Sequence, residues 1–221
     1  VIDASRTITV STVPVVPPSS GTGLLTDTGI TANQCFQAGS NVLVSCTSAA
    51  AIALNASQDG MVGRDVSSPS NTDGKLGFSY STVPNPAGGS FAVTECVKDN
   101  ITGLTWEGKT ATGTRAGSAT YTNYDNLAVG QVGYNISTSV NPTQAQIDAP
   151  TNTVGYKNAV NASALCGYTN WRLPTVDELE SLVDYGVAYD AALRPTIDAT
   201  WFPNTAAGLY WSSSPYYMGS A

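Results

Sequence analysis

Four cysteines are the side chains most able to do chemistry in this sequence, which contains no histidine. They are Cys35, Cys46, Cys96 and Cys166, and no two stand at the C-x-x-C spacing that binds metals or exchanges disulfides. Two disulfide bonds are the simplest use of four cysteines so widely spaced. The cysteines therefore predict a structural role and an oxidising compartment.

The absence of histidine excludes several classes of enzyme and metal site. Without an imidazole the chain cannot build a Ser-His-Asp or Cys-His nucleophile pair, a His-ligated zinc or haem, or a His general base. Most hydrolase mechanisms are lost with these groups. The sequence thus predicts a protein that is not an enzyme, with no catalytic and no cofactor-binding residues.

Charge excludes other partners. Only 11% of the 221 residues are charged, and 16 acidic against 9 basic residues give a net charge of -7. A nucleic acid partner is therefore not expected, because phosphate backbones are bound by basic surfaces.

No apolar run is long enough for a transmembrane segment. A composition rich in Thr, Ser, Asn and Gly is typical of exported bacterial proteins, which indicates an extracellular or cell-surface location.

Carboxylates in loops are the remaining candidates for a metal site. Asp59, Asp65 and Asp73 lie among Gly, Ser and Asn, and such oxygen ligands suit Ca²⁺. No D-x-D-x-D-G loop and no E-P-N or W-N-D sugar-binding triplet accompanies them, so a calcium site is the less favoured interpretation. A second acidic group is expected to form the solvated face of a helix: Asp177, Glu178, Glu180 and Asp184.

Two helices are expected in the second half of the chain. The first covers residues 156–166, where alanines and Leu165 precede Gly167, a residue suited to a left-handed C-terminal position. The second begins after Thr175, whose hydroxyl can accept a bond from the amide three residues on while the Glu178 side chain reaches back. An apolar stripe then defines its core face and ends at Gly186: Val176, Leu179, Leu182 and Val183.

Three regions of the chain differ in pattern. Residues 1–21 contain an alternating β-branched stretch at 6–13 followed by a Pro-rich linker. This N-terminal β arm either folds onto its own domain or adds to a neighbouring subunit's sheet edge. Residues 22–90 predict short strands and long loops, and the Gly/Pro-rich segment 84–90 marks a boundary to residues 91–221. Within the middle region, Cys35 and Cys46 would close a small hairpin-like loop.

Three segments contain specific sequence motifs, which inform beyond the overall composition. D-N-I-T-G-L-T-W-E at 99–107 predicts a tight turn feeding a strand that carries Trp106 inward. G-Y-T-N-W-R-L-P-T-V-D-E-L at 167–179 predicts an aromatic packed on the core before a capped helix. F-P-N-T at 202–205 precedes Y-W-S-S-S-P at 210–215, a strand with a buried tryptophan. The structural residues of these motifs are Trp106, Trp171, Arg172, Pro174, Thr175, Glu178 and Trp211.

These segments, in this order, resemble the Lcl C-terminal domain family, a bacterial extracellular domain. Upstream residues, among them T-D-T-G at 26–29 and Gln58-Asp59, resemble an extension found in many members, so the likeness covers 23–214. The resemblance implies a C-type-lectin-like α+β fold, akin to the formylglycine-generating enzyme, with a small antiparallel sheet, two helices and long loops. It also implies that Cys96 and Cys166 form a structural bridge and not a pair of active-site cysteines.

Family members usually continue after Y-W-S-S with strands that carry a W-x-V-x-F pattern, whereas this chain stops at Ala221. The domain is therefore expected to be incomplete at its C-terminal end. Either the sequence is a fragment of a longer product or another chain supplies the strands, and the first interpretation is favoured.

Two functions follow from this resemblance and from the patterns at the chain ends. The leading hypothesis is an extracellular, non-enzymatic recognition or adhesion module that binds a glycan or protein ligand on a surface. The alternative is a structural subunit of an extracellular filament or surface assembly, in which copies of the chain pair through the N-terminal arm or an open sheet edge.

Overall fold

The computed structural model describes residues 28–63, 78–127, 131–132, 139–185 and 195–214. The strand predicted at 6–13 and the loop carboxylates Asp65 and Asp73 lie outside these residues, as does the chain after Ser214. What the sequence predicts for these segments stays a prediction.

A small unit built around a disulfide between Cys35 and Cys46 comes first. Its hairpin pairs β1 (Cys35–Gln37) with β2 (Ser40–Val44), as the sequence predicted. Gly39 lies in the tight turn with a φ of +71°, a conformation that glycine adopts without strain. Two short helices follow the hairpin: α1 (Ala49–Leu54) and α2 (Asp59–Val62).

Helix α1 corrects the prediction of short strands and loops for residues 22–90. Ser48 begins the helix, because its hydroxyl accepts a hydrogen bond from the Ala51 amide at 3.2 Å. Alanine, the best helix former, supplies most of α1, and its small side chain lets Ala51 lie fully buried beside the disulfide. The apolar stretch 49–54 thus forms a helix and not a strand.

The central sheet has three antiparallel strands in the order β3 (Tyr80–Thr82), β4 (Cys96–Asp99) and β5 (Thr105–Glu107). The segment 84–90, expected as a boundary, lies between β3 and β4, which pair with each other. A bridge between Pro84 and Ser90 closes its base. Strand β3 therefore shares one sheet with the strands that follow it.

The turn from β4 to β5 has the predicted form. The buried Asp99 carboxylate accepts bonds from the amides of Ile101 and Thr102, at 2.8 and 3.1 Å, and from the Thr102 hydroxyl at 2.7 Å. Gly103, with a φ of +79°, donates its amide to the Asp99 carbonyl, and Leu104 begins the return. The Asp99 carboxylate thus supplies the hydrogen-bond acceptors that water would otherwise provide to three donors. The turn can therefore be buried.

Each face of this sheet carries its own apolar cluster, because neighbouring residues on a strand point to opposite faces. On β4, Val97 joins the cluster Phe78, Tyr80, Val97, Leu182 and Phe202, against which Trp106 packs. Cys96 joins the cluster Val83, Cys96, Val160, Leu165 and Cys166, against which Trp171 packs. Both tryptophans are half-buried at the borders of these clusters.

The later part of the chain adds further short elements: β6 (Gln131–Val132), β7 (Ser139–Val140), α4 (Gln144–Ile147), α5 (Thr153–Ala162), the 3-10 turn η2 (Leu165–Gly167) and α6 (Val176–Glu180). β6 and β7 pair antiparallel. A capping box between Thr143 and Gln146 begins α4.

Helix α5 differs from the predicted 156–166, since it begins at Thr153 and ends at Ala162. The chain then takes left-handed conformations at Ala164 and Cys166, with φ of +48° and +52°. Neither is a glycine, so the surroundings must hold them, and the disulfide to Cys96 is one such restraint. Gly167 has the predicted positive φ, +80°, but it closes η2 and not the helix.

Helix α6 begins as predicted and ends early. Thr175 and Glu178 form the expected capping box, yet the last helical residue is Glu180. Val176, assigned to the core stripe, is 45% exposed, while Leu182 is buried beyond the helix end. The apolar spacing therefore continues into a turn that follows the helix.

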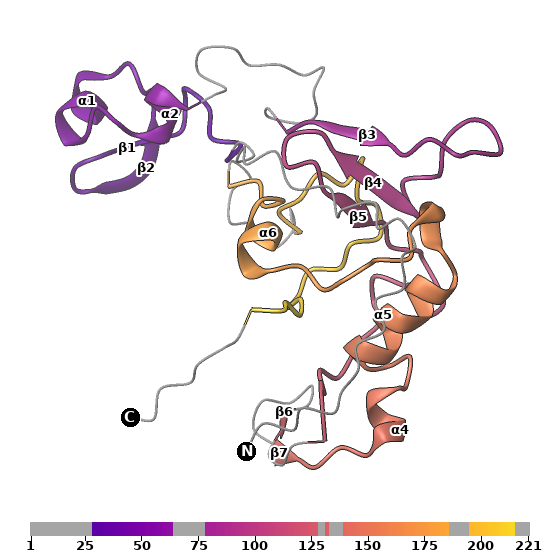
Figure 1. The fold of residues 1–221 in the computed structure, drawn as a ribbon. Coiled ribbons are helices and arrows are strands. Elements are labelled where there is room, and N and C mark those ends of the chain that lie inside the picture. The colour runs from indigo at the N-terminus through magenta and orange to yellow at the C-terminus, as the bar shows by residue number, and fades with distance from the viewer. Residues whose placement is uncertain (1–27, 64–77, 128–130, 133–138, 186–194, 215–221) are drawn as a thin grey trace, which may run out of the picture.

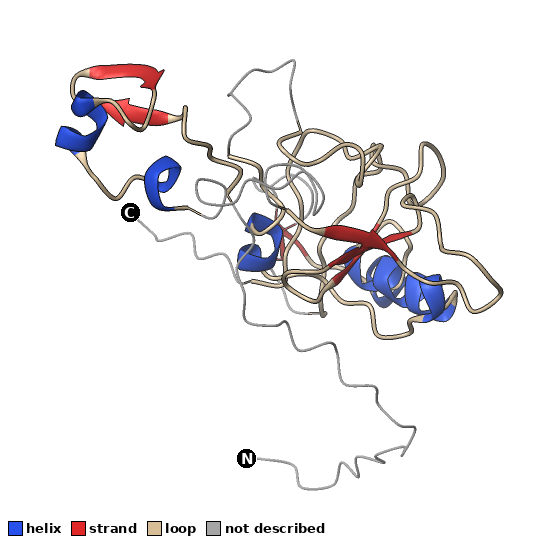
Figure 2. Cartoon of the chain, turned by 90° about the horizontal axis from the view of Figure 1, so that it is seen from above, coloured by secondary structure: helices blue, strands red, loops and turns tan. Residues whose placement is uncertain are grey.

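The described residues form an α+β structure of small antiparallel sheets, few helices and long loops (Figure 1). Both views place the unit of β1, β2, α1 and α2 at one end of the molecule, apart from the sheet β3–β5 (Figure 1 and Figure 2). In the described ranges, no helix has the length and apolarity needed to cross a bilayer.

Candidate functional site

The stretch 167–172, which begins at the last residue of η2 and leads toward α6, is the most exposed part of the sequence motifs. Gly167, Tyr168, Thr169 and Asn170 are all exposed, as is Arg172, whereas Trp171 is half-buried. The exposed side chains offer a phenol ring, a hydroxyl, an amide and a guanidinium within one short stretch. This stretch, called here the 167–172 loop, is the candidate binding surface.

A disulfide fixes the start of the loop. Cys166 is bonded to Cys96, so the residue just before the loop is tied to the central strand β4. This confirms the bridge that the family resemblance implied. With both sulfurs in the bridge, neither cysteine is available as a thiol nucleophile.

Asn161 and Trp171 fix the end of the loop. The Asn161 side chain accepts from the Trp171 amide at 2.6 Å and donates to the Trp171 carbonyl at 3.0 Å. The indole Nε1 donates to the Leu165 carbonyl at 3.2 Å, and Tyr168 packs edge-on against the indole at 5.9 Å between ring centroids. Trp171 packs against the cluster of Cys96 and Cys166, in line with the core packing expected from the sequence, and it also supports the exposed Tyr168.

A charged pair borders the loop. Arg172 binds the Glu178 carboxylate through both guanidinium Nη atoms, at 2.8 and 2.5 Å, and the same carboxylate accepts from the Thr175 amide at 2.8 Å. The Arg172 bond, reinforced by Thr175, lowers the pKa of the Glu178 carboxyl below its usual range. Glu178 therefore joins the loop to the helix cap.

The third motif contacts the second. Ser213 donates both its amide and its hydroxyl to the Pro174 carbonyl, at 2.7 and 3.1 Å, and the Ser214 hydroxyl accepts from the Val176 amide at 3.0 Å. Residues 210–214 form no strand within the described part of the chain, which corrects the sequence prediction. The serines instead satisfy backbone groups around the α6 N-terminus.

Trp211 is half-buried, not fully buried as predicted, and its indole donates to the Tyr121 carbonyl at 2.8 Å. That bond links the third motif to the chain that follows β5. Within this motif, Trp211 thus contacts the chain after β5, while Ser213 and Ser214 contact the start of α6.

A polar cluster around Glu107 was not found from the sequence. Its carboxylate accepts from Arg115 Nε at 3.0 Å, from Lys109 Nζ at 3.3 Å and from the Tyr156 hydroxyl. Arg115 Nη2 also donates to the carbonyls of Thr94, Glu95 and Gly108. Burial and the Glu107 carboxylate raise the pKa of the Tyr156 phenol. Because internal bonds occupy these groups, the cluster joins β5 to α5 and leaves little for a ligand.

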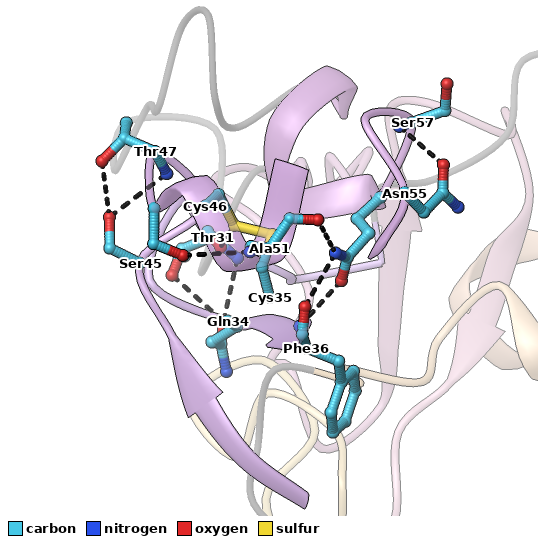
Figure 3. The surroundings of a disulfide bond; sticks show 12 residues. Thr31, Gln34, Cys35, Phe36, Ser45, Cys46, Thr47, Ala51, Asn55 and Ser57 are labelled. Atoms are coloured by element: carbon cyan, nitrogen blue, oxygen red, sulfur yellow. Dashed lines mark hydrogen bonds between the residues drawn. A yellow bond between two sulfur atoms is a disulfide. The ribbon is translucent and has the colours of Figure 1, made fainter. Parts of the chain in front are cut away.

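The unit around the Cys35–Cys46 disulfide (Figure 3) differs from the loop in the side chains that it exposes. Six of its large apolar side chains are exposed: Phe36, Val42, Leu43, Ile52, Leu54 and Val62. Asp59 is the only charged residue among 28–63, and it accepts a bond from the Thr28 hydroxyl. The unit therefore carries little charge, and it exposes several large apolar side chains.

The acidic candidates do not gather into one site. Asp177 and Glu180 are exposed as predicted, but Asp184 is 1% exposed, because the chain turns inward after α6 and its amide donates to the Thr196 carbonyl at 3.0 Å. No group of three or more metal-ligating side chains occurs in the described ranges. Asp59 is the one described member of the expected calcium carboxylates.

Sequence reasoning missed Asn161 and Glu107. Asn161 begins an N-A-S triplet, which the pattern indicates only as a glycosylation signal. Arg115 lies in a Gly/Thr-rich stretch with no helical or strand period that would align it with Glu107. Their roles depend on loop geometry, for which a single sequence gives no signal.

Comparison with known families identifies the domain that contains the loop. The sequence model of the Lcl C-terminal domain matches residues 95–221, more than half of the chain. Residues upstream of 95, including the Cys35–Cys46 unit, lie outside the matched region. Searches of curated proteins and of solved structures returned no match. From β4 onward the chain carries this domain and its Cys96–Cys166 bridge, and it belongs to the Lcl C-terminal domain family.

Proposed function

We propose that this protein is an extracellular, non-enzymatic recognition or adhesion module with a C-type-lectin-like domain, and that the 167–172 loop is its binding surface. Family membership and the two disulfides support the location. The small antiparallel sheet with flanking helices and long loops supports the fold. The observation that carries the proposal is the exposed loop held at both ends.

The chemistry of the loop favours a glycan or a polar protein surface as the ligand. Tyr168 offers a flat ring at low cost in side-chain entropy, and its contact with Trp171 restrains it. Thr169 and Asn170 add hydrogen-bonding groups beside the ring. Restraints at Cys166 and Asn161 reduce the entropy that binding would otherwise lose.

The chemistry of the chain supports a role without catalysis. It has no histidine to act as a general base, and all four cysteines are in disulfides. The Tyr156 hydroxyl donates a hydrogen bond to the Glu107 carboxylate inside the domain. A binding role needs only exposed side chains, and it requires neither a general base nor a free thiol.

The test uses the full chain in a glycan array and in an attachment assay on cultured cells. The expected result is saturable binding that Tyr168→Ala weakens at least tenfold. Tyr185→Ala is the matched control, because Tyr185 is 56% exposed and lies outside the loop. Thermal unfolding of both variants should match that of the parent protein.

Two results would contradict different parts of the proposal. Absence of binding to every glycan and cell surface would argue against the recognition function. Binding that Tyr168→Ala leaves unchanged would keep the function but move the site away from the 167–172 loop.

A further inference from the structure

The 167–172 loop contains one cation, and an internal partner neutralises its charge. Arg172 is the only basic residue in 158–185, and its side chain is 52% exposed. Both of its Nη atoms donate to the Glu178 carboxylate, and Nη1 also donates to the Leu173 carbonyl at 3.1 Å. A guanidinium on a surface is well suited to bind a sulfate, phosphate or carboxylate group. In this loop a carboxylate of the same chain is already bound to it.

The Glu178 side chain is held in position by the helix cap as well as by Arg172. Its carboxylate accepts from the Thr175 amide at 2.8 Å, and the Glu178 amide donates to the Thr175 hydroxyl at 3.2 Å. The Glu178 side chain is only 22% exposed. Because the cap already orients the carboxylate, the ion pair forms with little further loss of side-chain entropy. The pair is therefore better restrained than a contact between two unrestrained surface side chains.

The other charged side chains of this stretch are acidic. Asp177 and Glu180 are exposed on α6. Residues 167–180 contain one positive and three negative charges, so their formal net charge is -2. An anionic ligand would meet a surface of its own sign, and the repulsion would oppose its binding.

The loop offers a ligand mainly neutral groups. Tyr168 is 38% exposed, with its ring packed edge-on against Trp171, and Thr169 and Asn170 are exposed beside it in the sequence. An aromatic ring can cover the apolar C–H face of a sugar, while a hydroxyl and an amide can bond to the sugar hydroxyls. A neutral sugar can use all three side chains and needs no cation.

We propose that Glu178 determines which ligand class the 167–172 loop accepts: by holding the Arg172 guanidinium, it excludes acidic glycans and leaves the loop selective for neutral sugars. This inference rests on the proposed recognition function. Glu178 acts through Arg172 and is therefore a positioning residue, which need not touch the ligand. Removing its charge would leave an unneutralised cation in the loop, and anionic sugars would then bind.

The test is a glycan array in which each neutral sugar is paired with its sulfated or sialylated counterpart, probed with the full chain. The parent protein should bind the neutral member of a pair about fivefold more tightly. Glu178→Gln keeps an acceptor for the Thr175 amide but loses the charge, and it should shift the ratio of the two dissociation constants about fivefold toward the acidic member. Salt at about 1 M should abolish this shift, because it screens exposed charges.

Two further variants assign the shift to the guanidinium. Glu180→Gln removes the same formal charge at an exposed position of the same helix, and it should change the ratio less than about twofold. Adding Arg172→Gln to Glu178→Gln should return the ratio to that of the parent. The ratio remains interpretable if a variant is less stable, because a smaller folded fraction weakens the apparent binding of both ligands equally.

The possible outcomes separate this inference from the recognition function. Tighter binding of the acidic members by the parent would overturn the inference and leave the function in place. A Glu178→Gln shift no larger than that of Glu180→Gln would do the same, as would binding to cell-surface protein and to no glycan. Absence of binding to every glycan and cell surface would contradict the recognition function, and this inference with it.

Discussion

Side-chain amides take the place of regular backbone pairing in this protein. Asn152, fully buried, accepts from the Tyr124 amide at 2.8 Å and the Thr122 hydroxyl at 2.9 Å. It donates to the carbonyls of Tyr124 and Ile147, both at 2.9 Å. All four hydrogen-bonding positions of the amide are thus used, and Asn161 serves Trp171 in a similar way. Chain segments with little sheet or helix are held by such residues.

Asn152→Ala should lower the free energy of unfolding by about 3 kcal/mol, because several buried backbone groups lose their partner. Urea denaturation followed by tryptophan fluorescence measures the change. Asn158→Ala, at an exposed position of helix α5, which Asn152 precedes, is the control and should stay within about 0.5 kcal/mol of the parent. A small effect at Asn152 would show that water replaces the amide.

Glu178→Gln separates the ion pair from the helix cap, since glutamine can still accept from the Thr175 amide. Arg172 is half exposed, so the pair should contribute less than about 1 kcal/mol. Because Arg172 lowers the pKa of Glu178, this contribution is present above the unfolded value, about pH 4.3, and is lost as the pH falls through the folded pKa.

The melting temperatures of parent and Glu178→Gln should therefore differ at pH 7 and converge below about pH 4. Glu180→Gln, at an exposed position of the same helix, is the matched control. A difference that stays constant down to pH 3 would assign the effect to packing and not to charge.

At the scale of the elements, a glycine lets the backbone of helix α2 pack closely against the N-terminal disulfide. Helix α2 lies on the Cys35–Cys46 disulfide through Gly60, where an added Cβ would stand 2.5 Å from Cys46 Sγ and 2.6 Å from the Thr31 carbonyl. The core of this unit is very small: Cys35, Cys46 and Ala51, with Val44 and Met61 against it. A displaced α2 would therefore expose much of that core.

Gly60→Ala should open the unit without unfolding the Lcl C-terminal domain. The expected readout is faster cleavage by protease within 28–63, measured by mass spectrometry, and faster reduction of the Cys35–Cys46 bond. Gly208→Ala is the control, because no atom lies within 4 Å of its added Cβ. Equal cleavage rates for the two variants would contradict this packing.

Local signals in the sequence predicted the elements that depend on neighbouring residues. The turn at Asp99 and the capping box of Thr175 and Glu178 are of this kind, because each acts over three or four positions. The ends of α5 and α6 were wrong, since contacts distant in sequence set them. Cys166 leaves the helical conformation where a disulfide holds it, and the chain after Glu180 turns inward and buries Asp184.

The candidate site was predictable only in part for the same reason. Trp171 and Arg172 stand in a recognisable motif, whereas Asn161 acts through a loop bond across ten positions. The low charge of the Cys35–Cys46 unit can be read from the sequence. The exposure of its large apolar side chains cannot, because apolar residues ordinarily predict a core.

At the scale of the whole molecule, each disulfide holds a separate apolar cluster. Cys35–Cys46 closes a short loop in the N-terminal unit, and Cys96–Cys166 spans 70 positions between β4 and the 167–172 loop. The longer bridge restricts the unfolded chain more and should contribute about 4 kcal/mol, against about 3 kcal/mol for the shorter one.

Replacing each pair by serine should therefore have different consequences. Without Cys35–Cys46, amide hydrogen exchange should rise in 28–63 alone. Without Cys96–Cys166, it should rise in β3–β5 and in α5, because Cys96 and Cys166 lie in one cluster with Val160. Exchange that rises throughout the chain in both variants would show a single cooperative unit.

The central claim is that a restrained 167–172 loop is the recognition surface of this Lcl C-terminal domain. Asn161→Ala tests it most directly, because the substitution removes the bonds to Trp171 and leaves every exposed side chain of the loop in place. The measurement is attachment of the full chain to the surface that the parent protein binds, at a temperature where both are folded. We expect the apparent dissociation constant to rise about tenfold. Without the Asn161 bonds, the loop has more conformational freedom before binding and loses more of it when the ligand binds. Attachment equal to that of the parent, with faster exchange at the Trp171 amide, would contradict the claim.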